Sequence, residues 1–301
     1  MENLIKEIGW IGTGVMGKSI CKHLLKAGYS LSVFNRTKSK TDDLISSGAK
    51  YATPREIAQT CDAVFLMLGY PHDLEDVIFN KDAIINYLKP GSYLIDHTTS
   101  SPKLAEKIYQ ECKTKGIFSL DAPVSGGDVG AKEGKLVIMT GGDKEAFDKA
   151  TPIFSKYGTT IKLMGGPGKG QHTKMVNQIA IVNNMQGVVE ALIYGYKAGL
   201  DLEKVIETIG GGAAASFSLN VLGPRMLKRN FDPGFYVEHF IKDLEIALEE
   251  ARRMNLCLPG LALVKQFYQS LAANGGGKMG TQGLLLVLEK LNNVDLSKKL
   301  Q

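Results

Sequence analysis

The chain has 301 residues, of which 44% are apolar and 22% are charged. This length and balance are typical of a globular protein with roughly two domains, and they exclude a disordered chain, a collagen and a disulfide-stapled miniprotein. The formal charge of +5 comes from 36 basic and 31 acidic residues, a balance that argues against nucleic acid as a partner. The unusual figure is the 34 glycines, about one residue in nine against an average of about 7%.

The sequence indicates neither a metal site nor a membrane segment. Its five histidines never stand three or four residues apart, and its four cysteines form no C-x-x-C motif, so the spacing of a zinc site is missing. Apolar runs such as AVFLML at 63–68 are far shorter than the roughly 20 residues of a membrane span. The first ten residues lack the apolar stretch of a secretory signal. We therefore expect a cytoplasmic protein with reduced cysteines and no bound metal.

The first half of the chain predicts alternating strands and helices. Amphipathic segments separate short apolar runs, and in the first of these segments Met16, Ile20 and Leu24 recur every fourth residue, as one helix face requires. This alternation is typical of a mostly parallel sheet with helices on both faces. The apolar runs predict strands at 7–11, 31–34, 63–68, 92–96, 118–124 and 135–142.

After residue 165 the pattern becomes helical. A glycine-rich break covers 164–170, one long helix is predicted from Gln171 to about Ala198, and Asp201 is the expected N-cap of the next helix. The predicted fold class is therefore α/β. A Rossmann-type doubly wound nucleotide-binding domain at 1–168 is followed by an all-α domain at 169–301, and the long helix links the two.

The first glycine cluster predicts a dinucleotide site. Gly12, Gly14 and Gly17 follow a predicted strand and open a predicted helix, which is the setting of the G-x-G-x-x-G fingerprint. In that fingerprint the first glycine permits a tight turn, the second lets pyrophosphate approach, and the third lets helix and sheet pack closely. The intervening Thr13, Val15 and Met16 join the predicted cofactor contacts.

Two rival motifs also occur in the first half of the chain. GTGVMGKS also matches the P-loop pattern, with Lys18 and Ser19 in the phosphate positions and Asp96 as a Walker-B-like carboxylate. Tyr109 and Lys113 match the Y-x-x-x-K pair of short-chain dehydrogenases, but they lie in a charged helical segment, and we interpret that match as chance.

The end of the second predicted strand indicates the cofactor. An NAD-selective site has Asp or Glu about 20 residues after the glycines, whereas this chain has Asn35, Arg36 and Thr37. A guanidinium pairs bidentately with phosphate oxygens. We therefore predict a preference for NADP(H), with NAD(H) as a possible second cofactor.

Two further clusters suit an anionic substrate. Ser125, Gly126 and Gly127 follow a strand and offer a hydroxyl and two unobstructed backbone amides to a carboxylate. At the start of the long helix, Gln171, Lys174, Asn177 and Gln178 share one helical face, and we expect this polar face to line a cleft because the rest of the helix is apolar. A glycine turn and a solvated helix face are the alternative interpretations.

Three motifs together resemble the β-hydroxyacid dehydrogenase family, which holds 3-hydroxyisobutyrate dehydrogenase, tartronate semialdehyde reductase and the glyoxylate/succinic semialdehyde reductases. They are IGWIGTGVMG at 8–17, LDAPVSGG at 120–127 and GPGKGQHTKMVNQ at 166–178, and the similarity extends through 231–244. The resemblance implies that Lys174 is catalytic, that Ser125, Gly126 and Gly127 hold the substrate carboxylate, and that Asn177 and Gln178 position it. It also implies cofactor contacts from Thr99 and Lys242, and the end of the third predicted strand adds Met67 and Leu68.

The chain departs from the family at Gln178, where several members carry Asn, and at 280–282. These departures leave the identity of the substrate open. The main hypothesis is an NADP(H)-preferring oxidoreductase that interconverts a small aldehyde acid and its hydroxy acid, of the succinic semialdehyde/glyoxylate or tartronate semialdehyde reductase type. A 3-hydroxyisobutyrate dehydrogenase, a P-loop phosphotransferase and a catalytically silent nucleotide-binding protein are the alternatives. We expect a homodimer or homotetramer, and neither nucleic acid nor a membrane as partner.

Overall fold

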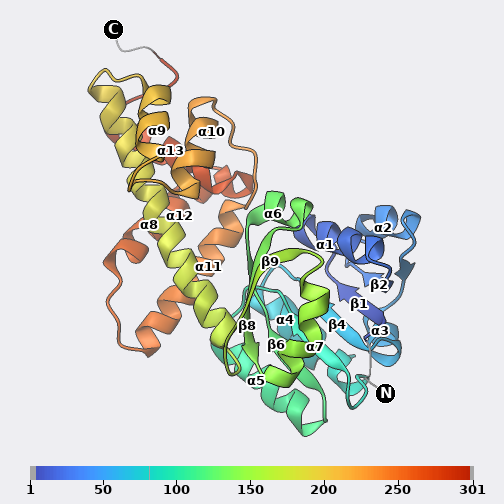
Figure 1. Ribbon diagram of the computed structural model, residues 1–301. Coiled ribbons are helices and arrows are strands. Elements are labelled where there is room, and N and C mark those ends of the chain that lie inside the picture. Colours follow the sequence, from blue (N-terminus) through green and yellow to red (C-terminus); the bar gives the residue numbers. More distant parts are fainter. Residues whose placement is uncertain (1–4, 81, 299–301) are drawn as a thin grey trace. The chain divides into compact units, whose positions relative to one another are not determined.

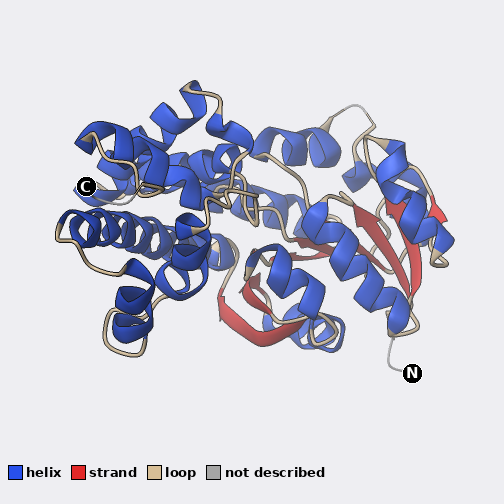
Figure 2. Ribbon diagram, turned by 90° about the horizontal axis from the view of Figure 1, so that it is seen from above, coloured by secondary structure: helices blue, strands red, loops and turns tan. Residues whose placement is uncertain are grey.

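The computed structural model describes residues 5–80 and 82–298 (Figure 1). Its internal contacts divide the chain into two compact units, Met1–Lys174 and Met175–Gln301, and the boundary falls within helix α8 (Lys169–Lys197). All strands of the described residues lie in the first unit, and the second is helical (Figure 2).

One sheet forms the centre of the first unit, with the strand order β3-β2-β1-β4-β5-β6-β8-β7 and with β9 paired to β8. Strands β1 to β6 pair in parallel, and β8 runs antiparallel to β6. Because the chain order reverses between β1 and β4, the carboxyl ends of these two strands flank the crevice where doubly wound sheets bind ligands. The strands are β1 (Glu7–Ile11), β2 (Ser30–Phe34), β3 (Lys50–Tyr51), β4 (Ala63–Leu66), β5 (Tyr93–Asp96), β6 (Phe118–Asp121), β7 (Val124–Ser125), β8 (Leu136–Gly142) and β9 (Gly158–Gly165).

Helices cover both faces of this sheet, as the alternation of the strand residues requires. In β4, Phe65 belongs to one apolar cluster and its neighbour Val64 to the other, and both side chains are fully buried. The first cluster includes residues of α1 (Val15–Lys26), α6 (Gly127–Glu133) and α7 (Lys144–Phe154). The second includes residues of α3 (Pro54–Thr60), α4 (Pro71–Phe79), the short turn η2 (Ile84–Asn86) and α5 (Pro102–Thr114). Two short helices follow β2, η1 (Lys38–Thr41) and α2 (Asp42–Ser46).

The predicted strands are confirmed, with differences at their ends. The third ends at Leu66 rather than 68, and the fifth ends at Asp121 because Pro123 has no N–H to continue the ladder. Strands β3 and β9 were missing from the prediction, and β7 was represented only by Val124 at the end of the predicted strand 118–124. Two of them have only two residues, and β9 pairs with β8 alone and exposes most of its residues, so it lacks an apolar run.

The second unit is an all-α assembly around one apolar core. The long helix contributes Val182, Met185 and Val189 to that core, at the spacing of one helix face, and they pack with Phe240 and Tyr268. Asp201 caps the next helix, as predicted, because its side chain accepts from the backbone N–H groups of residues 203 and 204. The remaining elements are α9 (Leu202–Gly210), η3 (Ser218–Leu222), α10 (Gly223–Leu227), α11 (Val237–Arg253), α12 (Pro259–Ala273), η4 (Gly276–Lys278), η5 (Thr281–Gly283) and α13 (Leu284–Asn292).

Across the described parts of the chain, none of the helices combines the length and the apolarity that crossing a membrane requires.

Candidate cofactor and catalytic site

The three glycines after β1 each have the environment that the dinucleotide fingerprint requires. Gly12 has a φ of 104°, and a Cβ there would lie 2.2 Å from the carbonyl oxygen of Met67. A Cβ at Gly17 would lie 2.1 Å from the carbonyl oxygen of Gly12, so only glycine lets α1 pack this closely on the loop. A Cβ at Gly14 would meet no protein atom within 4 Å. Gly14 therefore borders open space, where a phosphate can approach the backbone.

The amino end of α1 is suited to a phosphate. Gly14 is its N-cap, no side chain caps it, and its first turn contains no acidic residue. Backbone N–H groups at a helix start attract anions through their partial positive charge. Val15 is exposed there, Met16 packs on the first apolar cluster, and Thr13 is buried with its Oγ1 donating to the carbonyl oxygen of Lys40. The glycine loop and helix α1 together fit the pyrophosphate of a dinucleotide.

The loop after β2 lies beside the glycine loop. Asn35 Oδ1 accepts from the backbone N–H of Thr13 at 3.1 Å, and Asn35 Nδ2 donates to the carbonyl oxygen of Thr37 at 3.0 Å. The amide of Asn35 thus joins the two loops. The side chain of Arg36 is 90% exposed and forms an ion pair with Asp73 at 3.2 Å. Solvent-exposed pairs of this kind contribute about 0–1 kcal/mol, so the guanidinium is available to a phosphate.

The loops after β4 and β5 complete this edge of the first unit. The backbone N–H of Met67 donates to the carbonyl oxygen of Ile11 at 2.9 Å, and that of Leu68 donates to Thr98 Oγ1 at 2.9 Å. Thr99 follows directly and is half-buried. The residues predicted to contact the cofactor in the first unit therefore lie on adjacent loops at the carboxyl ends of β1, β2, β4 and β5.

Lys174 lies in the first part of α8, and its side chain reaches strand β7. Its side chain is almost fully buried, with 7% exposed, and Nζ donates to the carbonyl oxygen of Val124 at 2.8 Å. Ser125 follows Val124 at the end of β7. Gly126 and Gly127 have φ values of 128° and 63° at the start of α6, a backbone that glycine adopts readily. The structure thus brings the predicted catalytic lysine next to the predicted carboxylate-binding segment.

The other predicted residues lie in the second unit. Asn177 and Gln178 follow Lys174 on α8, and Asn177 Nδ2 donates to Gln178 Oε1 at 2.7 Å. Gln178 Nε2 donates to Oδ2 of the buried Asp243 at 2.6 Å, and Lys242 Nζ lies 2.9 Å from Asp243 Oδ1. Asp243 thereby holds Gln178 and Lys242 together, and the sequence analysis had not singled it out.

Sequence reasoning also missed Asp121 and misjudged Gln171. Gln171 lines no cleft: it is fully buried, its Nε2 donates to the carbonyl oxygen of Thr98 at 2.7 Å, and its Oε1 accepts from the N–H of Ser100 at 3.1 Å. Asp121 accepts from the N–H groups of Gly168 and Gln171. Burial raises the pKa of Asp121 to about 6, although these N–H groups act in the opposite direction. The feature that could have identified Asp121 is an acidic residue at the buried end of a strand.

The residues of the two rival motifs form contacts within the fold. Lys18 forms an ion pair with Asp43 on α2, and Asp96 Oδ1 accepts from the backbone N–H of Thr98 at 2.8 Å. Neither arrangement is that of a P-loop, in which the lysine reaches the phosphates. The Tyr109 hydroxyl donates to Asp143 at 2.8 Å from within α5, which fits a structural role.

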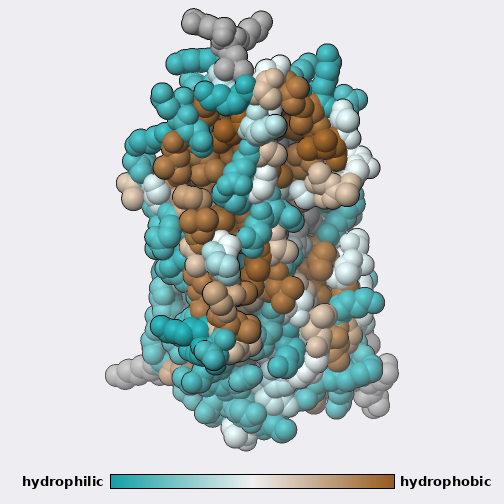
Figure 3. All heavy atoms as spheres, turned by 90° about the vertical axis from the view of Figure 1, so that its left-hand side faces the viewer, coloured by the Kyte–Doolittle hydropathy of each residue, from teal (hydrophilic) through white to brown (hydrophobic). Residues whose placement is uncertain are grey.

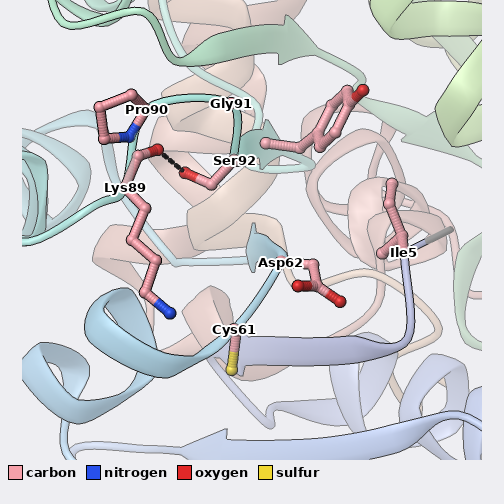
Figure 4. A pocket seen from close by; sticks show the side chains of 8 residues that line it. Ile5, Cys61, Asp62, Lys89, Pro90, Gly91 and Ser92 are labelled. Carbon is pink, nitrogen blue, oxygen red and sulfur yellow. Dashed lines mark hydrogen bonds between the residues drawn. The ribbon is translucent and has the colours of Figure 1, made fainter. Parts of the chain in front are cut away.

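Two other features of the first unit lie outside the predicted site. A cavity of about 140 Å³ is lined by Asp62, Lys89 and Ser92 among others (Figure 4). Because Asp62 and Ser92 directly precede β4 and β5, this cavity lies at the amino ends of the strands, away from the ligand-binding edge. His97 is fully buried between the carbonyl oxygen of Ala122 and the Tyr157 hydroxyl, and burial lowers its pKa to about 4.

In the described residues no group of three or more His, Cys, Asp or Glu side chains could hold a metal ion.

Both parts of the chain match models of known protein families. Residues 7–166 match the family model of the NAD-binding domain of 6-phosphogluconate dehydrogenase. Residues 168–288 match the model described as NAD-binding of NADP-dependent 3-hydroxyisobutyrate dehydrogenase. A probable mitochondrial 3-hydroxyisobutyrate dehydrogenase-like protein of Arabidopsis thaliana is 54% identical over 292 residues, which cover 96% of this chain and 87% of the relative.

A second relative agrees with these matches, and a solved structure agrees in its fold. The 2-hydroxy-3-oxopropionate reductase of Escherichia coli is 37% identical over 97% of this chain and its own full length. A solved 3-hydroxyisobutyrate dehydrogenase of Mycobacterium tuberculosis shares the fold, with a TM-score of 0.86 and 23% identity over 95% of this chain and 99% of that one. The P-loop alternative is therefore wrong, and the chain belongs to the β-hydroxyacid dehydrogenase family of NAD(P)-dependent oxidoreductases.

Proposed function

We propose that the protein is an NADP(H)-preferring reductase of small aldehyde acids, with Lys174 as the proton donor. The observation that carries this proposal is the position of Lys174, an almost fully buried amine bonded to the carbonyl oxygen of Val124 beside the Ser125–Gly127 segment. A buried amine next to a segment with backbone amides and a hydroxyl suits a substrate with both a carbonyl group and a carboxylate.

The glycine loop fits a nicotinamide dinucleotide, because Gly14 borders open space and no acidic residue opens α1. Bound there, the cofactor supplies a hydride to the carbonyl carbon of the substrate. Two observations support NADP(H): an exposed Arg36 where NAD-selective sites carry an acid, and the NADP-dependent family model that matches 168–288. The proposed cofactor contacts are Gly12, Thr13, Gly14, Val15, Met16, Gly17, Asn35, Arg36, Thr37, Met67, Leu68, Thr99 and Lys242.

Lys174 completes the reduction. As the carbonyl carbon gains an electron pair with the hydride, the carbonyl oxygen becomes an alkoxide and takes a proton from Nζ, which leaves a neutral amine and a hydroxy acid. In the reverse direction the neutral amine accepts the proton of the alcohol. The hydrogen bond to Val124 fixes Nζ in place, so that little reorganisation is needed at the moment of transfer.

Ser125, Gly126 and Gly127 are the proposed carboxylate site, and Asn177 with Gln178 the proposed orienting groups. A substrate of the tartronate semialdehyde type is favoured by the 37% identity to a 2-hydroxy-3-oxopropionate reductase, and glyoxylate or succinic semialdehyde belongs to the same chemical class. The 54% identity to a probable 3-hydroxyisobutyrate dehydrogenase-like protein favours a second candidate, the oxidation of 3-hydroxyisobutyrate.

The roles of the two parts of the chain are also proposed here. Residues 1–168 would bind the cofactor, and residues 169–301 would serve the substrate and oligomerisation. A homodimer or homotetramer is supported by large apolar side chains exposed in the second unit, where apolar atoms gather on the surface (Figure 3). They include Val176, Tyr194, Phe217 and Leu263. The cytoplasmic location stays a prediction from the sequence.

The direct test is a matrix of substrates and cofactors. Tartronate semialdehyde, glyoxylate and succinic semialdehyde are each assayed with NADPH and NADH, and 3-hydroxyisobutyrate with NADP+ and NAD+. We expect the highest kcat/KM for one of the aldehyde acids with NADPH. Turnover of 3-hydroxyisobutyrate alone would transfer the assignment to the second candidate, and a preference for NADH would refute the cofactor assignment.

A further inference from the structure

A buried carboxylate holds the start of the helix that carries Lys174. Asp121 is the last residue of β6, and only 6% of it is exposed. Its Oδ1 accepts from the backbone N–H of Gly168 at 2.8 Å, and its Oδ2 accepts from that of Gln171 at 2.8 Å. Helix starts leave backbone N–H groups without helical partners, and here an acid from another element satisfies two of them.

Two glycines make room for this contact. A Cβ at Gly141 would lie 2.5 Å from Asp121 Oδ1. A Cβ at Gly170 would lie 2.5 Å from the carbonyl oxygens of both Asp121 and Met139 and 2.8 Å from Asp121 Oδ2. The first turn of α8 therefore packs against the backbone of β6 and β8, at a distance that side chains at these two positions would prevent.

A second connection joins the same turn to the loop after β5. The side-chain amide of Gln171 binds the carbonyl oxygen of Thr98 and the N–H of Ser100, and Thr98 Oγ1 accepts from the N–H of Leu68. Each of these groups is buried or half-buried. The start of α8 is thus fixed to the end of β6 and to the loop after β5, and that loop in turn binds the loop after β4.

Lys174 lies three residues after Gln171, about one helical turn further on. Its Nζ binds the carbonyl oxygen of Val124, and Val124 lies three residues after Asp121 in the same segment. The segment 121–124 and the start of α8 are therefore joined by hydrogen bonds at both ends. Asp121 binds the first turn of the helix, and Lys174, one turn further on, binds Val124. A shift of the first turn would move Nζ away from its place beside Ser125.

We propose that Asp121 is a positioning residue for Lys174, which fixes the register of α8 on β6 and thereby the place of the proton donor. This inference depends on the proposed function, because it assigns Asp121 a role through Lys174. Asp121 itself touches neither cofactor nor substrate in this assignment. Its effect is on the geometry of proton delivery, where an error of about 1 Å can lower the rate by about a hundredfold.

The test is Asp121→Asn, which preserves shape but turns one acceptor oxygen into a donor that faces a backbone N–H. We expect kcat to fall at least tenfold while the Kd for NADPH stays within twofold. The solvent deuterium isotope effect on kcat should rise, because proton delivery becomes limiting. A purely structural defect would lower the fraction of active protein and leave that isotope effect unchanged. The concentration of active sites is therefore measured by NADPH binding, and kcat is calculated per active site.

Asp62→Asn is the matched control. Asp62 Oδ2 also accepts from two backbone N–H groups, those of Lys6 and Glu7, but at the amino end of β1. This substitution should leave kcat within twofold. If Asp121→Asn fails to fold, the proposal is tested with Gln171→Met instead. This substitution retains the volume and the helix propensity of the side chain but removes the hydrogen bonds to Thr98 and Ser100. We expect its kcat at saturating NADPH to fall at least threefold, with the same rise in the isotope effect.

Lys174→Ala separates this inference from the proposed function. If Lys174→Ala loses activity while folded Asp121→Asn retains kcat within twofold, the positioning role is refuted and the lysine's role stands. The same conclusion follows if only Gln171→Met folds and it retains kcat. If Lys174→Ala keeps activity within tenfold of the wild type, the proposed proton donor is wrong, and the positioning role of Asp121 falls with it.

Discussion

Replacing Gly14 by alanine should separate cofactor binding from folding. Gly14 has a φ of −68° and a ψ of −167°, which any residue adopts, and a Cβ there would meet no protein atom within 4 Å. The folded first unit should therefore accept the methyl group with a stability change within about 0.5 kcal/mol. The methyl carbon stands about 1.5 Å out from the backbone, in the space where the pyrophosphate must approach.

We expect Gly14→Ala to raise the Kd for NADPH at least tenfold, which corresponds to about 1.4 kcal/mol of binding free energy. Gly17→Ala, in contrast to Gly14→Ala, should lower the Tm in a thermal melt. Its Cβ would lie 2.1 Å from the carbonyl oxygen of Gly12 and 2.8 Å from Trp10 Nε1, and overpacking of this kind costs about 1–3 kcal/mol. For a domain of this size we expect a loss of several degrees in Tm.

The assay is fluorescence titration with NADPH beside a thermal melt of each variant. Gly187→Ala is the matched control, because a Cβ at this helical glycine of the second unit also meets open space; it should leave the Kd unchanged and raise the stability slightly. An unchanged Kd in Gly14→Ala would refute the placement of the pyrophosphate at this glycine. A Tm of Gly14→Ala as low as that of Gly17→Ala would refute the distinction between the two glycines.

Three further predictions follow from single residues. Arg36→Ala should weaken NADPH binding about tenfold and barely change NADH binding, and equal losses in the two titrations would contradict the 2′-phosphate role. Lys18→Ala should leave the KM for NADPH within twofold, since Lys18 pairs with Asp43; a large rise would show that this lysine does meet the phosphates. Burial lowers the pKa of His97 from the reference value of 6.5 to about 4 in the folded protein, so between these pH values the unfolded chain binds more protons than the folded one. The neutral imidazole therefore contributes its full stability above pH 6.5. This contribution is lost as the pH falls towards 4, and the loss is about 2 kcal/mol at pH 5. Melts from pH 7 to 5 should therefore show a smaller loss of Tm for His97→Gln than for the wild type, and parallel curves would contradict the buried neutral imidazole.

The glycine loop, the sheet and the helical second half could all be predicted from the sequence because their signals are local. Gly12, Gly14 and Gly17 follow a strand at fixed spacing, and the apolar period marks the strands and the long helix. The strands β7 and β9 could not be found in this way, since β7 has only two residues and β9 exposes most of its residues, so neither forms an apolar run of its own.

The polar contacts that hold the site could not be predicted because they join residues far apart in the chain. Gln171 shares a helical face with Lys174 in the sequence pattern, and periodicity alone assigned it to a cleft. Its burial depends on two backbone groups of the β5 loop, 71 and 73 residues away in the chain. The roles of Asp243 and Asp121 likewise depend on hydrogen-bond partners that lie 65 and 50 residues away in the chain.

The central claim is that Lys174 delivers the proton to the substrate oxygen. The most direct measurement is a single-turnover reaction of Lys174→Ala and of the wild type with NADPH and the best aldehyde acid of the panel. We expect the rate of NADPH oxidation to fall about a thousandfold, within the usual range for loss of a general acid, while the Kd for NADPH stays within twofold. A fall of less than tenfold, with the same Kd, would contradict the claim.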